Sequence, residues 1–470
     1  MPIQFGTDGW RAVIADEYTF ENVRHVAQAY GEVLEERGEA GRGVVVGYDT
    51  RFLSERFAQA AAEVLAAGGL RVVLAEAPIP TPAVSWAVRE LGTAGAVMIT
   101  ASHNPPEYNG FKIKASYAGS ALPELTSQVE QRLRENLERG KEPARGSGAG
   151  RIERADLLAP YVAQLRRLVD LEAIRRAGLR LAVDPMHGAG RGILRGLLEE
   201  AGLEVLELHG DLNPGFGGIA PEPIRRNLAE LMEAVPAGGW DLGVATDGDA
   251  DRVGAVDEKG EMVDAQRCFA LLLQHVVEEK HWQGSVVKTF AVTRMVDRLA
   301  ERYGLRFHKR PVGFKYVCEL ALEEPVLIGG EESGGVGFPA AHIPERDGIL
   351  SSLMLAEMVA QRGKPLGRIV RELMETVGTH VYDRVDLHLP PGRREALMEE
   401  LAERPPREFA GLAVTGVDPL DGFKYELGDH GWILIRPSGT EPIVRVYAEL
   451  DEPGRLQAVL EAGKRLALGG

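Results

Sequence analysis

The segment "TDGDADR" places a carboxylate at every second position, as Asp247, Asp249 and Asp251, and follows them with Arg252. Apolar runs typical of strands lie on both sides of it. Like charges this close repel one another and raise each other's pKa unless a cation lies among them. Alternate residues of an extended segment point the same way, so the three side chains can offer one face of oxygen ligands to Mg²⁺. The spacing therefore predicts a magnesium site.

The same aspartates also fit the opening of a calcium-binding EF-hand loop, with Glu258 at its twelfth position. That loop needs a glycine at its sixth position, where this chain has Arg252. Helices flank an EF-hand loop, whereas the flanks here favour strands. The EF-hand interpretation is therefore disfavoured, and a solvated acidic turn is the remaining alternative to a metal site.

A second polar segment, "TASHNP", centres on Ser102. No G-x-S-x-G elbow surrounds this serine and no triad partner can be assigned, which argues against a serine hydrolase. Alone, the segment is typical of an ordinary turn. Opposite a magnesium site it predicts a serine that accepts and returns a phosphoryl group, because such transfer needs mainly positioning and charge neutralisation. Lys112, ten residues further on, can reach back to that site.

Two more loops carry groups suited to a phosphorylated sugar. "GGEESGG" holds Glu331 and Ser333 between paired glycines, which let a ligand approach the backbone, and a carboxylate can accept hydrogen bonds from two neighbouring hydroxyls. "RPSGTEPIVR" supplies the guanidinium, hydroxyl and backbone N–H groups that bind phosphate. Its candidate residues are Arg436, Ser438, Gly439, Thr440 and Arg445. The alternatives are a surface turn for the first loop and a hairpin turn for the second.

A fifth segment, "DPMHGAGRGIL", lies between a predicted strand and a predicted helix, as a dinucleotide-binding loop would. Its glycines fall at 188, 190 and 192, and Ile193 follows them, so the G-x-G-x-x-G pattern is not met. The segment predicts a close strand-to-helix turn, and nucleotide binding is disfavoured.

The elements that must position these loops repeat three times in the order βαβαβ. The first unit runs from "GVVVGYD" to "AGAVMIT", the second from "LRLAVD" to "DLGVAT", and the third from "SVVKTF" to "PVLIGG". The serine, aspartate and "GGEESGG" loops each follow the last strand of a unit. Open α/β sheets bind ligands at the carboxyl ends of their strands, so the three loops are expected to converge on one cleft.

The fold class expected is therefore α/β, with three similar, mostly parallel domains and a smaller C-terminal α+β domain around a central cleft. We expect the domains to span residues 1–153, 154–257, 258–372 and 373–470, in which the serine, metal, sugar and phosphate loops lie in turn. The Gly-rich stretch 139–151 is expected to be a linker or turn between the first two units.

Bulk composition excludes several other classes. A chain of 470 residues with 44% hydrophobic and 26% charged residues is typical of a globular protein of several domains. A formal net charge of -16 argues against a nucleic-acid partner or an anionic membrane surface. The charged first thirty residues lack a signal-peptide core, and two cysteines form no disulfide framework, so a cytoplasmic location is expected. We expect a monomer or a homodimer.

Together the segments "FGTDGWR", "TASHNP", "DGDADR", "GEESGG" and "RPSGTEP" resemble the α-D-phosphohexomutase family, and its phosphoglucomutase/phosphomannomutase branch most closely. The resemblance covers essentially the whole chain and keeps the family's order of motifs. It implies an enzyme that interconverts glucose 1-phosphate and glucose 6-phosphate through a bound glucose 1,6-bisphosphate. Ser102 would be phosphorylated in the resting enzyme, and Mg²⁺ would be held by the three aspartates and a phosphoserine oxygen.

The resemblance also implies roles for the surrounding residues. Glu331 and Ser333 would hold the 3- and 4-hydroxyls of the sugar, and the "RPSGTEPIVR" residues would hold the non-reacting phosphate. His103 and Lys112 are the acid/base candidates nearest Ser102. The further basic residues of the cleft would be Arg11, Arg252, Lys288 and Lys315.

The chain departs from phosphomannomutase-type relatives at Gly335, where they often have histidine after the "G-E-x-S-G" motif. His342, in "HIPERDG", is expected to take over part of that acid/base role. The "GEES" form of the loop favours glucose over mannose or glucosamine phosphates. A phosphomannomutase or a dual-specificity phosphoglucomutase/phosphomannomutase is the alternative.

Two more distant alternatives stay open. A phosphosugar phosphatase would let water intercept the phosphoseryl group, but a simple hydrolase would not need the dedicated phosphate loop of the last domain. A non-catalytic metal- or sugar-binding module is disfavoured by the strands that flank the aspartates and by the lysine close to the serine loop.

Overall fold

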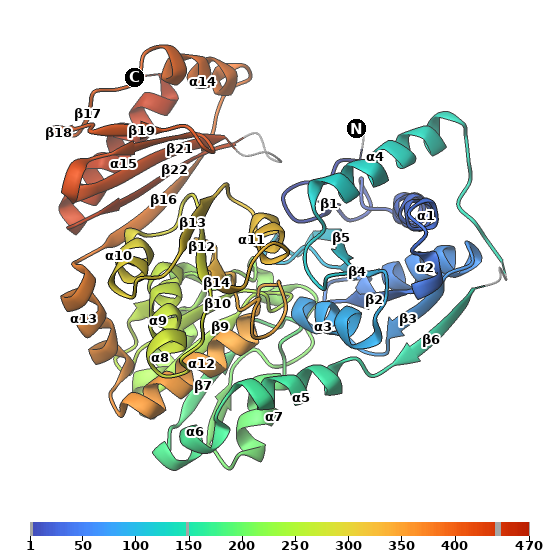
Figure 1. The fold of residues 1–470 in the computed structure, drawn as a ribbon, viewed down its shortest axis with the longest axis horizontal. Coiled ribbons are helices and arrows are strands. Elements are labelled where there is room, and N and C mark those ends of the chain that lie inside the picture. Colours follow the sequence, from blue (N-terminus) through green and yellow to red (C-terminus); the bar gives the residue numbers. More distant parts are fainter. Residues whose placement is uncertain (1–2, 147–149, 438–442, 470) are drawn as a thin grey trace.

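The computed structural model describes residues 3–146, 150–437 and 443–469. Four main sheets follow one another along the chain, and helices pack against each of them (Figure 1). No helix of the described residues is long and apolar enough to cross a membrane.

The first three sheets share one topology. Each has three parallel strands in the spatial order third, first, second, and an antiparallel strand beside the third. The parallel strands are β2 (Val44–Tyr48), β3 (Arg71–Ala75) and β4 (Gly95–Ile99), then β7 (Leu181–Asp184), β8 (Val205–Glu207) and β9 (Leu242–Thr246), then β12 (Ser285–Thr289), β13 (Phe307–Arg310) and β14 (Val326–Gly330). The antiparallel partners are β5 (Tyr108–Ala115), β10 (Val253–Val256) and β15 (Val336–Gly337).

Edge strands extend two of these sheets beyond the expected domain boundaries. β6 (Arg151–Ala155) pairs with β3, so the first sheet continues past residue 153. β11 (Met262–Val263) pairs with β10, so the second sheet continues past residue 257. β1 (Trp10–Val13) pairs with β5 and brings the N-terminal "FGTDGWR" segment alongside the first sheet.

Helices cover these sheets because the strands are buried on both faces. All five residues of β2, "VVVGY", are buried, as expected for a parallel strand with helices on either side. In the first domain these helices are α1 (Phe20–Glu36), α2 (Ser54–Ala67), α3 (Thr81–Leu91) and α4 (Pro123–Glu138). Those of the second are α5 (Leu158–Leu168), α6 (Leu171–Ala177), α7 (Ile193–Glu200) and α8 (Ala229–Gly238). Those of the third are α9 (Ala265–Glu278), α10 (Arg294–Arg302), α11 (Lys315–Ala321), α12 (Gly348–Arg362) and α13 (Leu366–Val377).

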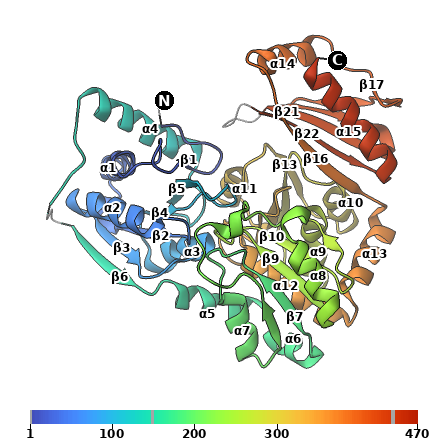
Figure 2. The same ribbon diagram turned by 180° about the vertical axis from the view of Figure 1, so that it is seen from behind.

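Helix α12 joins the second and third domains. Nearly all of its side chains are buried, as in a helix that is apolar all round and runs through a protein interior. It packs against β9 and β10 of the second sheet and against α9 and β15 of the third domain. Figure 2 shows it from behind, close to β9 and β10. Asp347 caps its first turn by accepting a hydrogen bond from the Leu350 N–H at 2.8 Å.

The fourth sheet is antiparallel throughout, which confirms the expected change to an α+β domain. Its strands in spatial order are β16 (Val381–His388), β22 (Ile443–Leu450), β21 (Gly431–Pro437), β20 (Phe423–Glu426) and β19 (Gly416–Asp418). Helices α14 (Arg393–Glu403) and α15 (Pro453–Leu468) form a core with one face, and a small hairpin, β17 (Glu408–Phe409) and β18 (Leu412–Ala413), lies beside them. On the other face Trp432, Leu434 and Tyr447 pack against Phe290 and Ala291 of the third domain.

Candidate active site

The three motif loops occupy equivalent places in the first three sheets. Each connects the third parallel strand to its antiparallel neighbour: residues 100–107 between β4 and β5, 247–252 between β9 and β10, and 331–335 between β14 and β15. The loops therefore start at the carboxyl ends of parallel strands, where open α/β sheets place their ligands. Hydrogen bonds and ion pairs join all three, so the predicted convergence is a feature of the structure.

Ser102 lies at the contact between the first two loops. It is buried, its φ is +53°, and its Oγ donates a hydrogen bond to Asp247 Oδ2 at 2.7 Å. Such a left-handed backbone is costly for a residue other than glycine and persists only where the surroundings fix it. Arg51 does so by donating from Nη2 to the carbonyls of Ser102 and Asn104, at 2.7 and 2.6 Å. A Cβ at Gly248 would lie 2.5 Å from the Ser102 carbonyl oxygen, so this close approach requires glycine.

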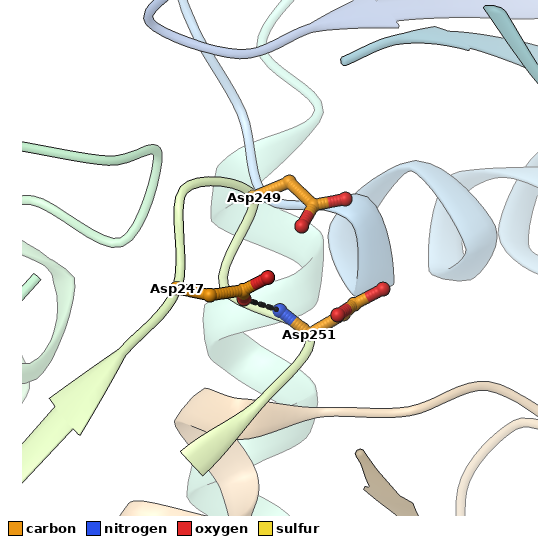
Figure 3. Close-up of side chains that lie close together, drawn as sticks. All are labelled: Asp247, Asp249 and Asp251. Atoms are coloured by element: carbon orange, nitrogen blue, oxygen red, sulfur yellow. Dashed lines mark hydrogen bonds between the residues drawn. The ribbon is translucent and has the colours of Figure 1, made fainter. Parts of the chain in front are cut away.

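The three aspartates are fully buried, and their ligand atoms lie within 4.8 Å of one another (Figure 3). Asp247 Oδ1 accepts hydrogen bonds from the N–H groups of Asp251 and Arg252, at 2.9 and 3.1 Å. The outer oxygens of the other two are also occupied. Asp249 Oδ2 binds Thr81 Oγ1 and Lys112 Nζ, at 2.5 and 2.8 Å, and Asp251 Oδ2 binds Arg346 Nη2 at 2.7 Å and Lys112 Nζ at 3.2 Å.

The remaining oxygens of Asp249 and Asp251 are suited to bind a cation. Both Oδ1 atoms are buried and have no hydrogen-bond partner among the described residues. Burial and the two neighbouring aspartates raise the pKa of Asp247 well above its usual value. Burial would do the same to Asp249, but Lys112 outweighs it and holds that pKa below the ordinary range. A cation among the three would relieve this crowding, and a set of carboxylate oxygens suits a hard divalent ion.

Lys112 pairs with the aspartates of the metal loop, and His103 lies beside the serine. Burial opposes the charge on Lys112, but Asp249, Asp251 and Asp8 outweigh it and raise the pKa of Lys112, so its ammonium group stays charged. His103 Nδ1 lies 3.5 Å from Ser102 Oγ. Burial and nearby arginines hold the pKa of His103 well below its usual value, so its imidazole is neutral at pH 7.

Arg11 and Arg252 add positive charge beside the same group of side chains. Arg11 Nη1 donates to Asn104 Oδ1 at 2.6 Å, on the serine loop. The Nε atom of Arg252 lies 3.9 Å from carboxylate oxygens of Asp247 and Asp251. Burial lowers the pKa of Arg11, and Asp8 opposes that shift. We call Ser102, Lys112 and the three aspartates the serine–aspartate junction.

The sugar loop is tied to this junction through one arginine. Glu331 is buried and accepts a hydrogen bond from Arg346 Nη1 at 2.8 Å, while Nη2 of the same guanidinium binds Asp251. Burial raises the pKa of Glu331, and Arg346 opposes that shift. Ser333 is half-buried on the same loop. The predicted sugar-binding residues therefore lie next to the predicted metal loop.

The fourth sheet presents three arginines on neighbouring strands. Arg436 on β21 faces Arg445 on β22, which in turn faces Asp386 on β16. Arg384, two residues before Asp386, lies on the same face of β16. We call Arg384, Arg436 and Arg445 the arginine row.

Charges across the domains show what the arginine row faces. Arg384 contributes to the lowered pKa of His103, after burial, Arg252 and Arg11. Glu332 of the sugar loop helps to raise the pKa of Arg436, after Asp421 and Tyr447. Ser438, Gly439 and Thr440, the rest of the predicted phosphate loop, lie outside the described residues.

Three further predicted residues, His342, Lys288 and Lys315, lie outside both the junction and the motif loops. His342 is buried against Trp86, with ring centroids 5.2 Å apart, and its Nε2 lies 3.3 Å from the capping carboxylate of Asp347. This buried packing between α3 and α12 does not suit the predicted acid/base role. Lys288 also lies outside the junction, and its Nζ is buried against the Val292 and Thr293 carbonyls and Asp297.

Lys315 lies near charged groups of both the first and the fourth domains. It is half-buried, burial lowers its pKa, and it interacts with Asp8 and with Asp421 of the fourth domain.

Five residues of the site had no predicted role. Asp8 forms ion pairs with Lys112, at 2.9 Å, and with Arg346. Thr81, Arg51 and Arg346 hold the serine and metal loops, and Arg384 extends the arginine row. Asp8 and Arg346 lie within the segments "FGTDGWR" and "HIPERDG". The charged residues of these two segments could therefore have marked both as candidate site residues.

Comparison with known proteins agrees with this geometry along the whole chain. Four models of the phosphoglucomutase/phosphomannomutase family match in order: α/β/α domain I at residues 2–140, domain II at 159–260, domain III at 264–377 and the C-terminal domain at 396–463. The chain belongs to the phosphoglucomutase/phosphomannomutase family. It is therefore an isomerase of the phosphohexomutase type, and the predicted family, fold class and enzyme class are confirmed.

Individual relatives carry more than one substrate name. A phosphoglucomutase/phosphomannomutase of Thermococcus kodakarensis is 34% identical over 463 residues, which cover 98% of each chain. A phosphoglucosamine mutase of Frankia casuarinae is 34% identical over 476 residues, or 97% of this chain and 96% of the relative. A crystal structure from Thermus thermophilus, assigned as a phosphomannomutase, is 41% identical and superposes with a TM-score of 0.87 over 99% of both chains. Membership of the family therefore does not identify which hexose phosphate the protein converts.

Proposed function

We propose that the protein interconverts glucose 1-phosphate and glucose 6-phosphate by way of a phosphoryl group on Ser102 and a bound glucose 1,6-bisphosphate. The observation that carries the proposal is the position of Ser102 Oγ, 2.7 Å from Asp247, in a cluster where Oδ1 of Asp249 and Oδ1 of Asp251 are buried and have no hydrogen-bond partner among the described residues. A simple serine turn would need neither feature.

The aspartate cluster is suited to Mg²⁺, because its free donors are all carboxylate oxygens. Asp247, Asp249 and Asp251 would hold the ion, together with an oxygen of phosphorylated Ser102. When bound, it neutralises charge on the phosphoryl group that is transferred.

Two transfers of opposite direction complete the reaction. In the first, the hydroxyl oxygen of a hexose monophosphate bonds to phosphorus, the bond from phosphorus to Ser102 Oγ breaks, and a 1,6-bisphosphate results. The hydroxyl proton passes to a base, for which neutral His103 is suited, and Ser102 Oγ regains a proton. In the second, Ser102 Oγ gives up its proton and bonds to the other phosphorus of the bisphosphate, the bond from that phosphorus to the sugar oxygen breaks, and this oxygen takes up a proton to leave the isomeric monophosphate.

Lys112 is suited to a different role from His103. Its pKa is raised by the carboxylates around it, so it supplies positive charge and a donor proton rather than a base. The ion pairs with Asp249 and Asp8 also fix its Nζ at the junction.

The two ends of the substrate would lie on the two parts of the site. Glu331 and Ser333 would bind the sugar hydroxyls, and Arg436 and Arg445 would bind the phosphate that does not react, together with Ser438, Gly439 and Thr440. Because either phosphate must reach Ser102, this arrangement has to accept the bisphosphate in both orientations.

A phosphorus NMR time course tests the proposal. Protein, Mg²⁺, glucose 1-phosphate and a trace of glucose 1,6-bisphosphate should give growing glucose 6-phosphate without inorganic phosphate. Release of inorganic phosphate would instead identify a phosphatase, and an unchanged spectrum would contradict the proposed substrate. Parallel runs with mannose 1-phosphate and glucosamine 1-phosphate rank the hexoses, and we expect glucose to be converted fastest.

A further inference from the structure

Arg346 occupies a place that the reaction as proposed does not account for. It is buried, yet it lies in the connection just before α12 instead of in one of the three motif loops. The Asp347 N–H donates to the Val336 carbonyl at 2.8 Å, and the Gly348 N–H donates to the Ala250 carbonyl at 3.1 Å. The backbone around Arg346 is thus fixed between β15 on one side and the metal loop on the other.

The Arg346 guanidinium links carboxylates from three parts of the chain. Its Nη1 donates to Glu331 of the sugar loop at 2.8 Å, and its Nη2 lies 2.7 Å from Asp251 of the metal loop and also contacts Asp8 of the N-terminal segment. A planar fork can hold several oxygens at fixed angles, whereas a lysine ammonium acts as a single flexible point charge.

The aliphatic part of Arg346 is fixed as well. A Cβ at Gly335 would lie 2.3 Å from Arg346 Cδ and 3.0 Å from Cγ, so any side chain at 335 would displace the arginine. The Cζ atom also lies 5.7 Å from the centre of the Phe314 ring. Glycine at position 335 therefore leaves free the space that a side chain would take, and the aliphatic part of Arg346 occupies that space.

We propose that Arg346 is the positioning residue for sugar recognition, which holds the Glu331 carboxyl group in register with the metal loop, and that Gly335 is required because of it. The proposal rests on the proposed function, since it concerns how Glu331 meets the sugar hydroxyls. Without its guanidinium partner, the buried Glu331 carboxyl would favour its neutral form and donate a hydrogen bond where it should accept two. The ligand class is a hexose phosphate with neighbouring free hydroxyls.

The test compares Arg346→Ala, Arg346→Lys and Gly335→Ala with wild type. Arg362→Ala is the matched control, because Arg362 lies at the far end of α12 and pairs with Glu278 and Glu279. We expect Arg346→Ala to raise the KM for glucose 1-phosphate by about 10- to 100-fold, the range for a lost charge-assisted hydrogen bond in a buried site. Arg346→Lys should resemble Arg346→Ala more than wild type, and Arg362→Ala should match wild type.

Chemical rescue distinguishes positioning from mere loss of structure. Guanidinium ion, well below denaturing concentration, should lower the KM of Arg346→Ala, and methylammonium at the same concentration should not. Calorimetric binding of glucose 6-phosphate in the presence of EDTA should show the same pattern without turnover. Gly335→Ala should raise the KM when it is the only substitution. It should change the KM of Arg346→Ala little, because the side chain with which the added methyl group would clash is already removed.

Several results would overturn the proposal. These are an unchanged KM in Arg346→Ala, equal rescue by both cations, or additive effects of the two substitutions. Should Arg346→Ala fail to fold, the KM values of Arg346→Lys and Gly335→Ala decide the same question. A wild-type protein that neither binds nor converts hexose phosphates would overturn the proposed function itself, which is a different result from normal turnover in every variant.

Discussion

The serine–aspartate junction and the arginine row are the two charged parts of this site, and they are built in opposite ways. The junction takes its serine and aspartates from loops between a parallel and an antiparallel strand and its lysine from β5, and these side chains are buried and paired between the first two domains. The arginine row takes its side chains from three adjacent strands of one sheet. Groups that take part in bond making need fixed geometry, whereas groups that hold a distant phosphate need charge and reach.

This difference predicts which kinetic constant, kcat or KM, a substitution in each region changes. Changes at the junction should lower kcat, since they remove interactions with the phosphoryl group in transfer. Changes in the arginine row should raise KM, since they remove binding that is similar in the ground state and the transition state.

Replacing the serine should have the largest effect. Ser102→Ala removes the oxygen that carries the phosphoryl group, and turnover should fall by at least about 10³-fold, as for loss of other catalytic nucleophiles. Binding of glucose 6-phosphate, measured by calorimetry, should change little. Ser127→Ala, on the exposed face of α4, is the control. Substantial turnover in Ser102→Ala would remove this serine from the chemistry.

Weakening the metal cluster should have the next largest effect. Asp249→Asn removes one of the two carboxylates with a free buried oxygen, so Mg²⁺ affinity and kcat should both fall by at least about 100-fold. Titration calorimetry with Mg²⁺ and activity measured against Mg²⁺ concentration check this. Asp241→Asn, at the opposite end of β9, provides a control on the same sheet. Equal Mg²⁺ affinity in wild type and Asp249→Asn would place the ion elsewhere.

A smaller change is expected in the arginine row. Arg436→Ala should raise the KM for glucose 1-phosphate by about 10- to 100-fold and leave kcat within about threefold, because it loses a charge-assisted contact with the distant phosphate. The KM of Arg436→Lys should lie between that of wild type and that of Arg436→Ala, since lysine keeps the charge and lacks the planar guanidinium fork. A fall in kcat with an unchanged KM would show that the arginine row takes part in the transfer step, and the division between the two regions would be wrong.

The smallest effect concerns the contact that holds the fourth sheet to the third domain. Lys424 is buried there, with its Nζ 3.1 Å from the Phe290 carbonyl and 3.9 Å from the centre of the Trp432 ring. Burial and the nearby Lys288 lower the pKa of Lys424 to about 7, against 10.5 for an ordinary lysine. Between these values the unfolded chain binds a proton that the folded protein does not, so stability rises with pH in that range.

Lys424→Met should therefore raise the free energy of unfolding most at pH 6, and the gain should shrink as the pH rises to 9. Urea unfolding at a series of pH values measures the difference. Lys464→Met, on the surface of α15, should show no such trend. A gain that grows with pH would mean that the charged form of Lys424 stabilises this contact.

The repeated units could be predicted because their signals are local. The Val-rich strands and the capped helices of all three units lie where their periodicity placed them, as in β2, α2 and β4. Of the antiparallel strands that follow the motif loops, β10 was predicted as the apolar run after the aspartates, whereas β5 and β15 were not. β15 has only two residues, and a stretch that short has no periodicity to detect.

The site was predictable to the same extent. Ser102 and the three aspartates lie in contiguous motifs, and the structure brings them together. Arg346 and Thr81 act through contacts made only by packing between domains, and a single charged or hydroxyl residue gives no sequence signal of a partner far away along the chain. His342 shows the converse difficulty, since a histidine inside a polar motif looks the same in sequence whether it faces a ligand or packs on Trp86, as it does here.

The most direct test of the central claim is the phosphorylation state of Ser102. After incubation with glucose 1,6-bisphosphate and Mg²⁺, mass spectrometry of the peptide that contains Ser102 should show one added phosphoryl group on this residue. Addition of excess glucose 1-phosphate should then remove it, with formation of the bisphosphate and no inorganic phosphate. A peptide that stays unmodified, or a phosphoryl group that is lost only to water, would contradict a mutase that works through Ser102.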